Sequence, residues 1–164
     1  MKLNIIRRIL IVLILCVFFV IFGFSNQNSQ TSGGTSQRVT EAITKNVKKI
    51  QNLEPKEKEK AINQIEHIVR KIAHYSIYTL LGLLLMGLMS TFKIKEMDKI
   101  AVSLIIGVLY ASTDEIHQAF VPGRGAQITD VMLDSMGVLT GIFITMLFLE
   151  VFRRICRKKY ENIT

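Results

Sequence analysis

Four long apolar runs constrain the fold of this chain more than any other feature of its sequence. They cover residues 9–24, 72–92, 100–120 and 131–152. A bilayer core of about 30 Å needs roughly 20 helical residues to cross it, and the second and fourth runs reach that length without a charged residue in their middles. The sequence therefore predicts an all-α integral membrane bundle of four transmembrane helices, at about residues 9–26, 72–92, 100–120 and 131–152.

The first and third runs are less certain to be transmembrane spans than the other two. The first is short, although Arg7 and Arg8 before it and Ser25 after it can lie at the headgroups and extend it. Because basic residues precede it and small residues follow, a cleaved signal peptide is the alternative. The third run is apolar only to Thr113, so by itself it also fits a buried helix of a soluble protein.

Basic residues predict the orientation of the spans. Cytoplasmic flanks carry an excess of Lys and Arg, and three flanks of this chain do so. These flanks are residues 2–8, 93–99 and 153–159. With four spans they share one side of the membrane, so we expect a multi-pass protein of the bacterial cell membrane with both termini cytoplasmic. Topology accounts for the net charge of +8, so no nucleic acid partner is expected.

The connection over residues 27–71 is expected outside the cell, within a single membrane domain covering residues 1–164. Its first part, up to residue 37, is rich in Ser, Gly and Asn and predicts a flexible exit from span one. Apolar residues then recur at helical spacing from Val39 to Ile50, and again after Pro55, a favoured first helical residue. Two amphipathic surface helices are predicted, the second running into span two and both covering the outer ends of the bundle, with partner or lipid recognition as the alternative role.

Polar and ionisable side chains collect where spans two, three and four reach the outer leaflet. Such groups are costly in a membrane segment unless they are paired or hydrated, so their convergence is a functional hypothesis. We expect them to form a ligand-binding site. Its predicted members are His74, Tyr78, Asp114, Glu115, His117, Gln118, Arg124, Asp130 and Asp134.

Helical spacing predicts how residues of span three are arranged. Asp114, His117 and Gln118 stand at i, i+3 and i+4 and are expected on one face, with Glu115 pointing away. In the loop that follows, Arg124 lies between two glycines and offers a planar fork suited to phosphate or carboxylate. The alternative is that these charges neutralise one another and only lock the helices together.

Spans two and four show the same kind of spacing. His74 and Tyr78 share a face of span two, as Asp130 and Asp134 share a face of span four. Gly137 and Gly141 continue near the aspartate face as a pair of small residues, which permits close approach of another helix.

At these residues the sequence resembles the VanZ-like membrane family, named for a protein associated with teicoplanin resistance. The resemblance rests on "FSNQ" after span one, "RKIAHYSIYTLLGLLL" in span two and "YASTDEIHQAFVPGRGAQITDVMLDSMG" across spans three and four. It implies a multi-pass bacterial envelope protein. The chain departs from the pattern at Asp134, where Asn is more usual.

Binding is the function we expect, with an anionic lipid, a cell-wall precursor or a lipophilic glycopeptide as ligand and membrane lipids as partners. An intramembrane enzyme is the alternative, because His117 beside carboxylates fits acid/base chemistry or, with His74, Asp114 and Asp130, metal binding. However, "DEIHQ" lacks the H-E-x-x-H zinc spacing and no nucleophile motif is present. We expect no cofactor and no metal. Transport is a third possibility, and the sequence does not set the oligomeric state.

Overall fold

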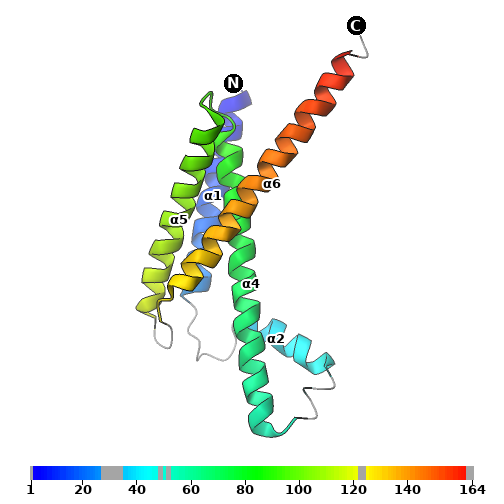
Figure 1. The fold of residues 1–164 in the computed structure, drawn as a ribbon. Coiled ribbons are helices and arrows are strands. Elements are labelled where there is room, and N and C mark those ends of the chain that lie inside the picture. The colour runs from blue at the N-terminus through cyan, green and yellow to red at the C-terminus, as the bar shows by residue number, and fades with distance from the viewer. Residues whose placement is uncertain (1, 27–34, 48–49, 51–52, 122–124, 162–164) are drawn as a thin grey trace.

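The fold is a helical bundle with four helices of membrane-spanning length. The computed structural model describes residues 2–26, 35–47, 50, 53–121 and 125–161. Over those residues it contains no strand and five helices: α1 (Lys2–Ser25), α2 (Thr35–Asn46), α4 (Pro55–Met89), α5 (Glu96–Ala119) and α6 (Ile128–Glu161) (Figure 1). All but α2 are long and apolar enough to cross a membrane. The predicted all-α bundle of four transmembrane helices is thereby confirmed.

Helix α4 joins a surface helix to a span without a break. It begins at Pro55, as predicted, and its 35 residues correspond to about 52 Å at 1.5 Å per residue. That length exceeds the roughly 30 Å of a bilayer core, so the first turns of α4 project beyond the other spans (Figure 1).

Helix α2 packs on the projecting part of α4 and on no other described helix (Figure 1). It buries Thr40 and Thr44, while Val39 and Ile43 are more than 40% exposed. The prediction that it covers the outer ends of the bundle is therefore wrong, because among the described helices α2 contacts only the projecting part of α4. It makes that contact with its polar face. The flexible exit was also expected too far along the chain, since α2 already begins at Thr35.

Glycines bring α4 and α6 into close contact where they cross. A Cβ added to Gly137 would lie 2.7 Å from the carbonyl oxygen of Tyr75, and one added to Gly141 would meet the carbonyl oxygen of Thr79. A Cβ on Gly82 would likewise meet the backbone of α6. The close approach predicted from the glycine spacing is confirmed, and it fixes the register of the two helices near the site.

Apolar side chains divide between a narrow core and a broad outward-facing surface. The core lies where α1, α4, α5 and α6 meet, and its most buried members include Ile21, Tyr78, Leu81 and Val138. Elsewhere large apolar side chains face outward, such as Phe19 at 76% exposure and Phe143 at 66%. A contiguous apolar surface of this kind marks a membrane-facing protein.

Helix α1 is attached to the bundle by polar contacts at both of its ends. Near its start, Arg7 donates hydrogen bonds to the side chain and carbonyl oxygen of Thr91 at 2.9 and 2.6 Å. Near its end, the Tyr110 hydroxyl donates to the carbonyl oxygen of Phe18 at 2.7 Å. These contacts make α1 a structural member of the bundle.

Candidate functional site

The polar side chains meet at one end of the bundle, which we call the site end. There α1 and α5 finish, α6 begins, and α4 passes from its projecting part into its span (Figure 1). Each helix delivers its polar residues within a few turns of this level. Residues far apart in the sequence thus become neighbours, while the middles of the same helices stay apolar.

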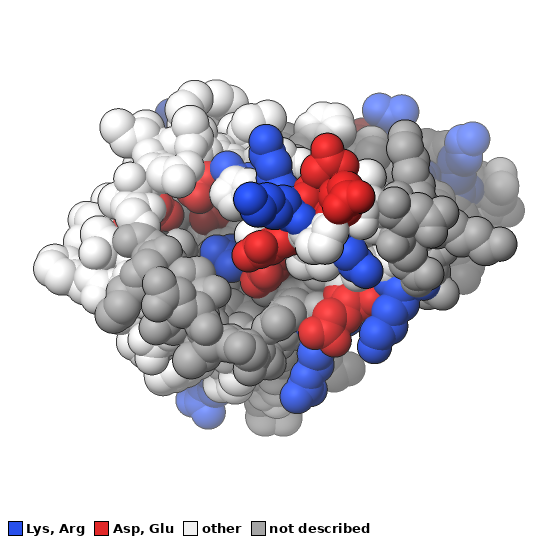
Figure 2. All heavy atoms as spheres, turned by 90° about the horizontal axis from the view of Figure 1, so that it is seen from below, with Lys and Arg blue, Asp and Glu red and all other residues white. Residues whose placement is uncertain are grey.

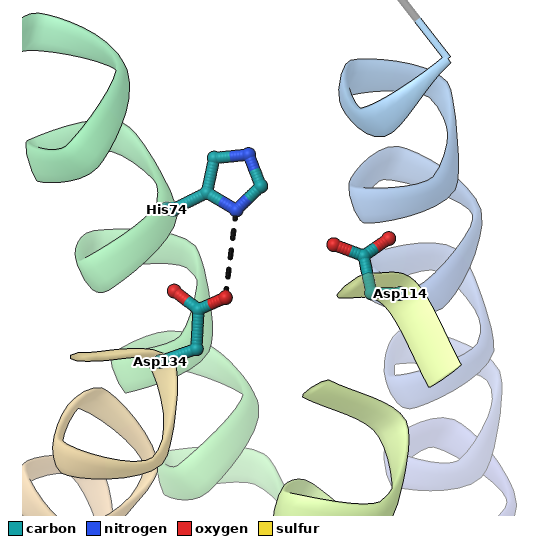
Figure 3. Close-up of side chains that lie close together, drawn as sticks. All are labelled: His74, Asp114 and Asp134. Atoms are coloured by element: carbon teal, nitrogen blue, oxygen red, sulfur yellow. Dashed lines mark ion pairs between the residues drawn. The ribbon is translucent and has the colours of Figure 1, made fainter. Parts of the chain in front are cut away.

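Three side chains from three helices face one another in the interior of the site end (Figure 3). The His74 Nδ1 atom on α4 lies 3.6 Å from Asp134 Oδ2 on α6. Asp114 on α5 completes a group in which one ligating atom of each residue lies within 4.8 Å of the others. Asp114 and Asp134 are 5% and 3% exposed, so both carboxyl groups are removed from solvent. We call these residues the buried triad.

Neutral donors from two helices hold Asp114 in place. The Ser25 hydroxyl at the end of α1 donates to Asp114 Oδ2 at 2.7 Å, and the Gln118 amide donates to the same oxygen at 3.0 Å. The Gln118 amide also lies 3.1 Å from the Ser25 oxygen. Sequence reasoning missed Ser25, which it placed at the headgroups, although a small polar residue ending an apolar run was the available signal.

A pocket of about 210 Å³ opens beside the buried triad. Its floor includes His74 and Asp134, and α4, α5, α6 and the segment before α6 all contribute to its wall. The lining residues are His67, Arg70, Lys71, His74, Glu115, Gln118, Gly125, Gln127, Leu133, Asp130 and Asp134.

Charges of both signs alternate at the pocket entrance. Lys71 Nζ lies 2.7 Å from Asp130 Oδ1, which ties α4 to α6, and Arg70 lies 3.5 Å from Glu66 one turn earlier on α4. Figure 2, which views the molecule from below, shows Lys and Arg side chains next to Asp and Glu side chains over this face of the molecule as a whole. Sequence reasoning missed both cations because it counted them with the long connection.

Glu115 and His117 take places opposite to those that spacing predicted. Glu115 is 5% exposed, lines the pocket and accepts a 2.6 Å hydrogen bond from the Gln127 backbone N–H. His117 instead stacks on Phe22 of α1 at 4.7 Å and does not line the pocket. Gln118 lies between Asp114 and Glu115 around the helix, so the face that α5 turns to the pocket is centred on Gln118 and excludes His117.

Tyr78 and Arg124 complete the predicted set. Tyr78 is fully buried one turn from His74, with ring centroids 6.4 Å apart, and its hydroxyl has no hydrogen-bond partner among the described residues. Arg124 lies outside the described residues.

Negative charge dominates the buried part of the site. Asp114, Glu115 and Asp134 are all buried, and no Lys or Arg within the described ranges forms an ion pair with any of them. Of the basic groups in the described part of the chain, His74 alone faces one of them. A buried carboxylate without a partner is costly, so the buried part of the site is suited to binding a cation or a hydrogen-bond donor. The part suited to an anion is the more exposed one, where Arg70 and Lys71 line the pocket.

These features define a class of protein: a multi-span α-helical membrane protein with a polar pocket at one end of its bundle. A protein-family model described as VanZ/LLP1 matches residues 10–149. The chain therefore belongs to the VanZ/LLP1 family, and the resemblance seen in its motifs is confirmed. No curated protein and no solved structure gives a significant match.

Proposed function

We propose that this VanZ-like protein binds, in the pocket at its site end, the anionic head group of a membrane lipid or of a lipid-linked cell-wall precursor. The observation that carries the proposal is the pocket itself, with Arg70 and Lys71 among the residues that line it. We propose further that both termini lie in the cytoplasm of a bacterial cell, so that the pocket faces the outer leaflet.

Pocket size favours a head group over a whole glycopeptide. Pockets that enclose drug-sized ligands measure about 300 to 1,000 Å³, whereas this one measures about 210 Å³. A glycopeptide antibiotic is larger than such a drug and would contact the pocket only with a substituent. A phosphate-bearing head group is small enough to enter, with its acyl or prenyl chain lying against the apolar faces of the spans.

The two cations at the entrance, Arg70 and Lys71, are free to form additional contacts with a ligand. The Arg70 side chain is 27% exposed and its contact with Glu66 is long at 3.5 Å, so its guanidinium can turn to a phosphate oxygen. Lys71 is 32% exposed and keeps donors beyond the one directed at Asp130. Both lie at the level where a head group would sit.

Lipid binding is testable with a matched pair of double variants. The double variant Arg70→Gln with Lys71→Gln removes the two cations at the entrance, while Lys93→Gln with Lys95→Gln removes two cations at the opposite end of the bundle. Native mass spectrometry of protein purified in mild detergent should show anionic lipid or precursor retained by the wild type and the control and lost from the entrance variant. Equal retention by all three proteins would refute the proposal.

Resistance to teicoplanin-type antibiotics is a further part of the proposal, because a pocket that holds a precursor head group can alter access to it. Cells that express the entrance variant should then lose any resistance that the wild-type chain confers. An enzymatic alternative rests on the His74–Asp134 contact at the pocket floor, which resembles an acid/base pair. Bound lipid that is converted with time, rather than released unchanged, would favour that alternative.

A further inference from the structure

We propose that the buried triad of His74, Asp114 and Asp134 binds a divalent metal ion, with Mn²⁺ or Zn²⁺ as the fitting class. This goes beyond head-group binding and does not depend on it, because the ion is held by protein side chains alone. Imidazole nitrogen together with carboxylate oxygen suits these metals, whereas Ca²⁺ and Mg²⁺ prefer oxygen ligands only.

The geometry places three ligands around a common point. Metal–ligand distances of about 2.0 to 2.2 Å put neighbouring ligand atoms about 3 to 3.5 Å apart. His74 Nδ1 and Asp134 Oδ2 are already 3.6 Å apart, and all three ligand atoms lie within 4.8 Å of one another. Side-chain rotations that close the triad by about 1 Å would complete the site (Figure 3).

Two buried polar atoms give independent support. Asp134 Oδ1 and the Tyr78 hydroxyl are both inaccessible to solvent and have no hydrogen-bond partner among the described residues. Nearly every buried polar atom in a folded protein has a partner, so each exception calls for an explanation. A bound ion would accept Asp134 as a ligand, and a water on that ion would serve the Tyr78 hydroxyl.

Charge balance points the same way. Two aspartates carry a total charge of −2, and a divalent ion beside a neutral His74 brings the triad to zero. Neutrality matters here because Asp114 and Asp134 are 5% and 3% exposed. His74 and Asp134 also line the pocket, so the ion would stand at its floor, where a phosphate oxygen of a head group could fill an open coordination position.

Direct measurement of metal on the purified protein tests the proposal. The protein is purified in detergent without a polyhistidine tag, and a chelator removes any bound metal. It is then titrated with Mn²⁺, whose binding is measured by electron paramagnetic resonance, or with Zn²⁺, whose binding is measured by calorimetry. The wild type should bind one ion per chain and unfold at a higher temperature when the ion is present. Absence of binding in the wild type would overturn the proposal, whatever the variants do.

Matched variants locate the ion. His74→Ala and Asp134→Asn should weaken binding at least about 100-fold, more than the 10- to 100-fold seen when a neighbour of a ligand is changed. His117→Ala and Glu150→Gln are the controls, since one alters a histidine stacked on Phe22 and the other an acidic residue paired with Arg154 at the opposite end of the bundle. Wild-type affinity in Asp134→Asn, or an equal loss in the controls, would overturn the assignment. Lipid retention in these proteins is scored separately, so failure of metal binding and failure of head-group binding remain distinguishable.

Discussion

Replacing Gly141 with alanine should destabilise the bundle through the crossing of α4 and α6. The added Cβ would meet the carbonyl oxygen of Thr79 and lie 2.6 Å from the Leu83 nitrogen and 2.9 Å from the Gly82 carbonyl carbon. All of these are backbone atoms, which cannot rotate away. Ordinary carbon contacts are about 3.5 to 4.0 Å, so the helices must separate locally by about 1 Å.

Overpacking of this kind costs roughly 1 to 3 kcal/mol, and in a membrane the packing contacts it disrupts are a main source of helix association. Gly87 on α4 is the matched control, because a Cβ there would meet nothing within 4 Å. Gly87→Ala should be neutral or more stable by up to about 1 kcal/mol, since alanine is the better helix former.

Unfolding in detergent, followed by far-ultraviolet circular dichroism because the chain has no tryptophan, measures both effects. Gly137→Ala extends the test toward the site. Its Cβ would lie 2.7 Å from the Tyr75 carbonyl oxygen. Because position 137 is one helical turn from Asp134, this variant should lose ligand binding as well as stability. Equal stability of Gly141→Ala and Gly87→Ala would refute the view that close backbone contact holds α4 to α6.

Three further outcomes are expected. Ser25→Ala removes a donor from buried Asp114 and should destabilise the protein by about 1 to 3 kcal/mol in the same unfolding assay; an unchanged value would mean that the hydrogen bond is dispensable. Asp134→Asn removes a buried charge at nearly constant shape, so metal-free protein should be as stable as the wild type or more so, and a large loss would contradict the charge argument. A reporter fused after Ser36 should indicate the exterior, and reporters fused after Lys95 and after Tyr160 should indicate the cytoplasm. A cytoplasmic signal from the fusion after Ser36 would refute the orientation.

The fold was predictable because hydrophobicity and length decide it. A run of some 20 apolar residues has few alternatives to a spanning helix, and Pro55 is a strong signal for a helix start. The contact made by α2 was not predictable in this way. Its apolar stripe, including Val39 and Ile43, faces outward, and only the tertiary structure shows that Thr40 and Thr44 form the buried side.

The convergence of polar side chains at one end of the bundle was predictable, but which side chains face one another there was not. Helical spacing tells which residues share a face, yet it does not tell which face a neighbouring helix covers. His117 and Glu115 flank the Asp114–Gln118 face on opposite sides. His117 packs on Phe22 of α1, whereas Glu115 accepts a hydrogen bond from Gln127 in the segment before α6. Ser25 is separated from Asp114 by 89 residues, so no local pattern could have paired them.

Burial and charge together determine what the site must do. An ionised carboxylate moved out of water carries an effective penalty of several kcal/mol, and proteins are stable by only about 5 to 15 kcal/mol in all, so three such charges cannot stay uncompensated. Among the residues that the structure describes, Asp114 has two neutral donors and Glu115 has one backbone N–H, whereas Asp134 has only His74 at 3.6 Å. Asp134 is therefore the least satisfied of the three and borders the pocket. A ligand that brought positive charge to Asp134 would therefore stabilise the fold and occupy the pocket floor in a single step, and it would link the stability of the bundle to the occupancy of the pocket.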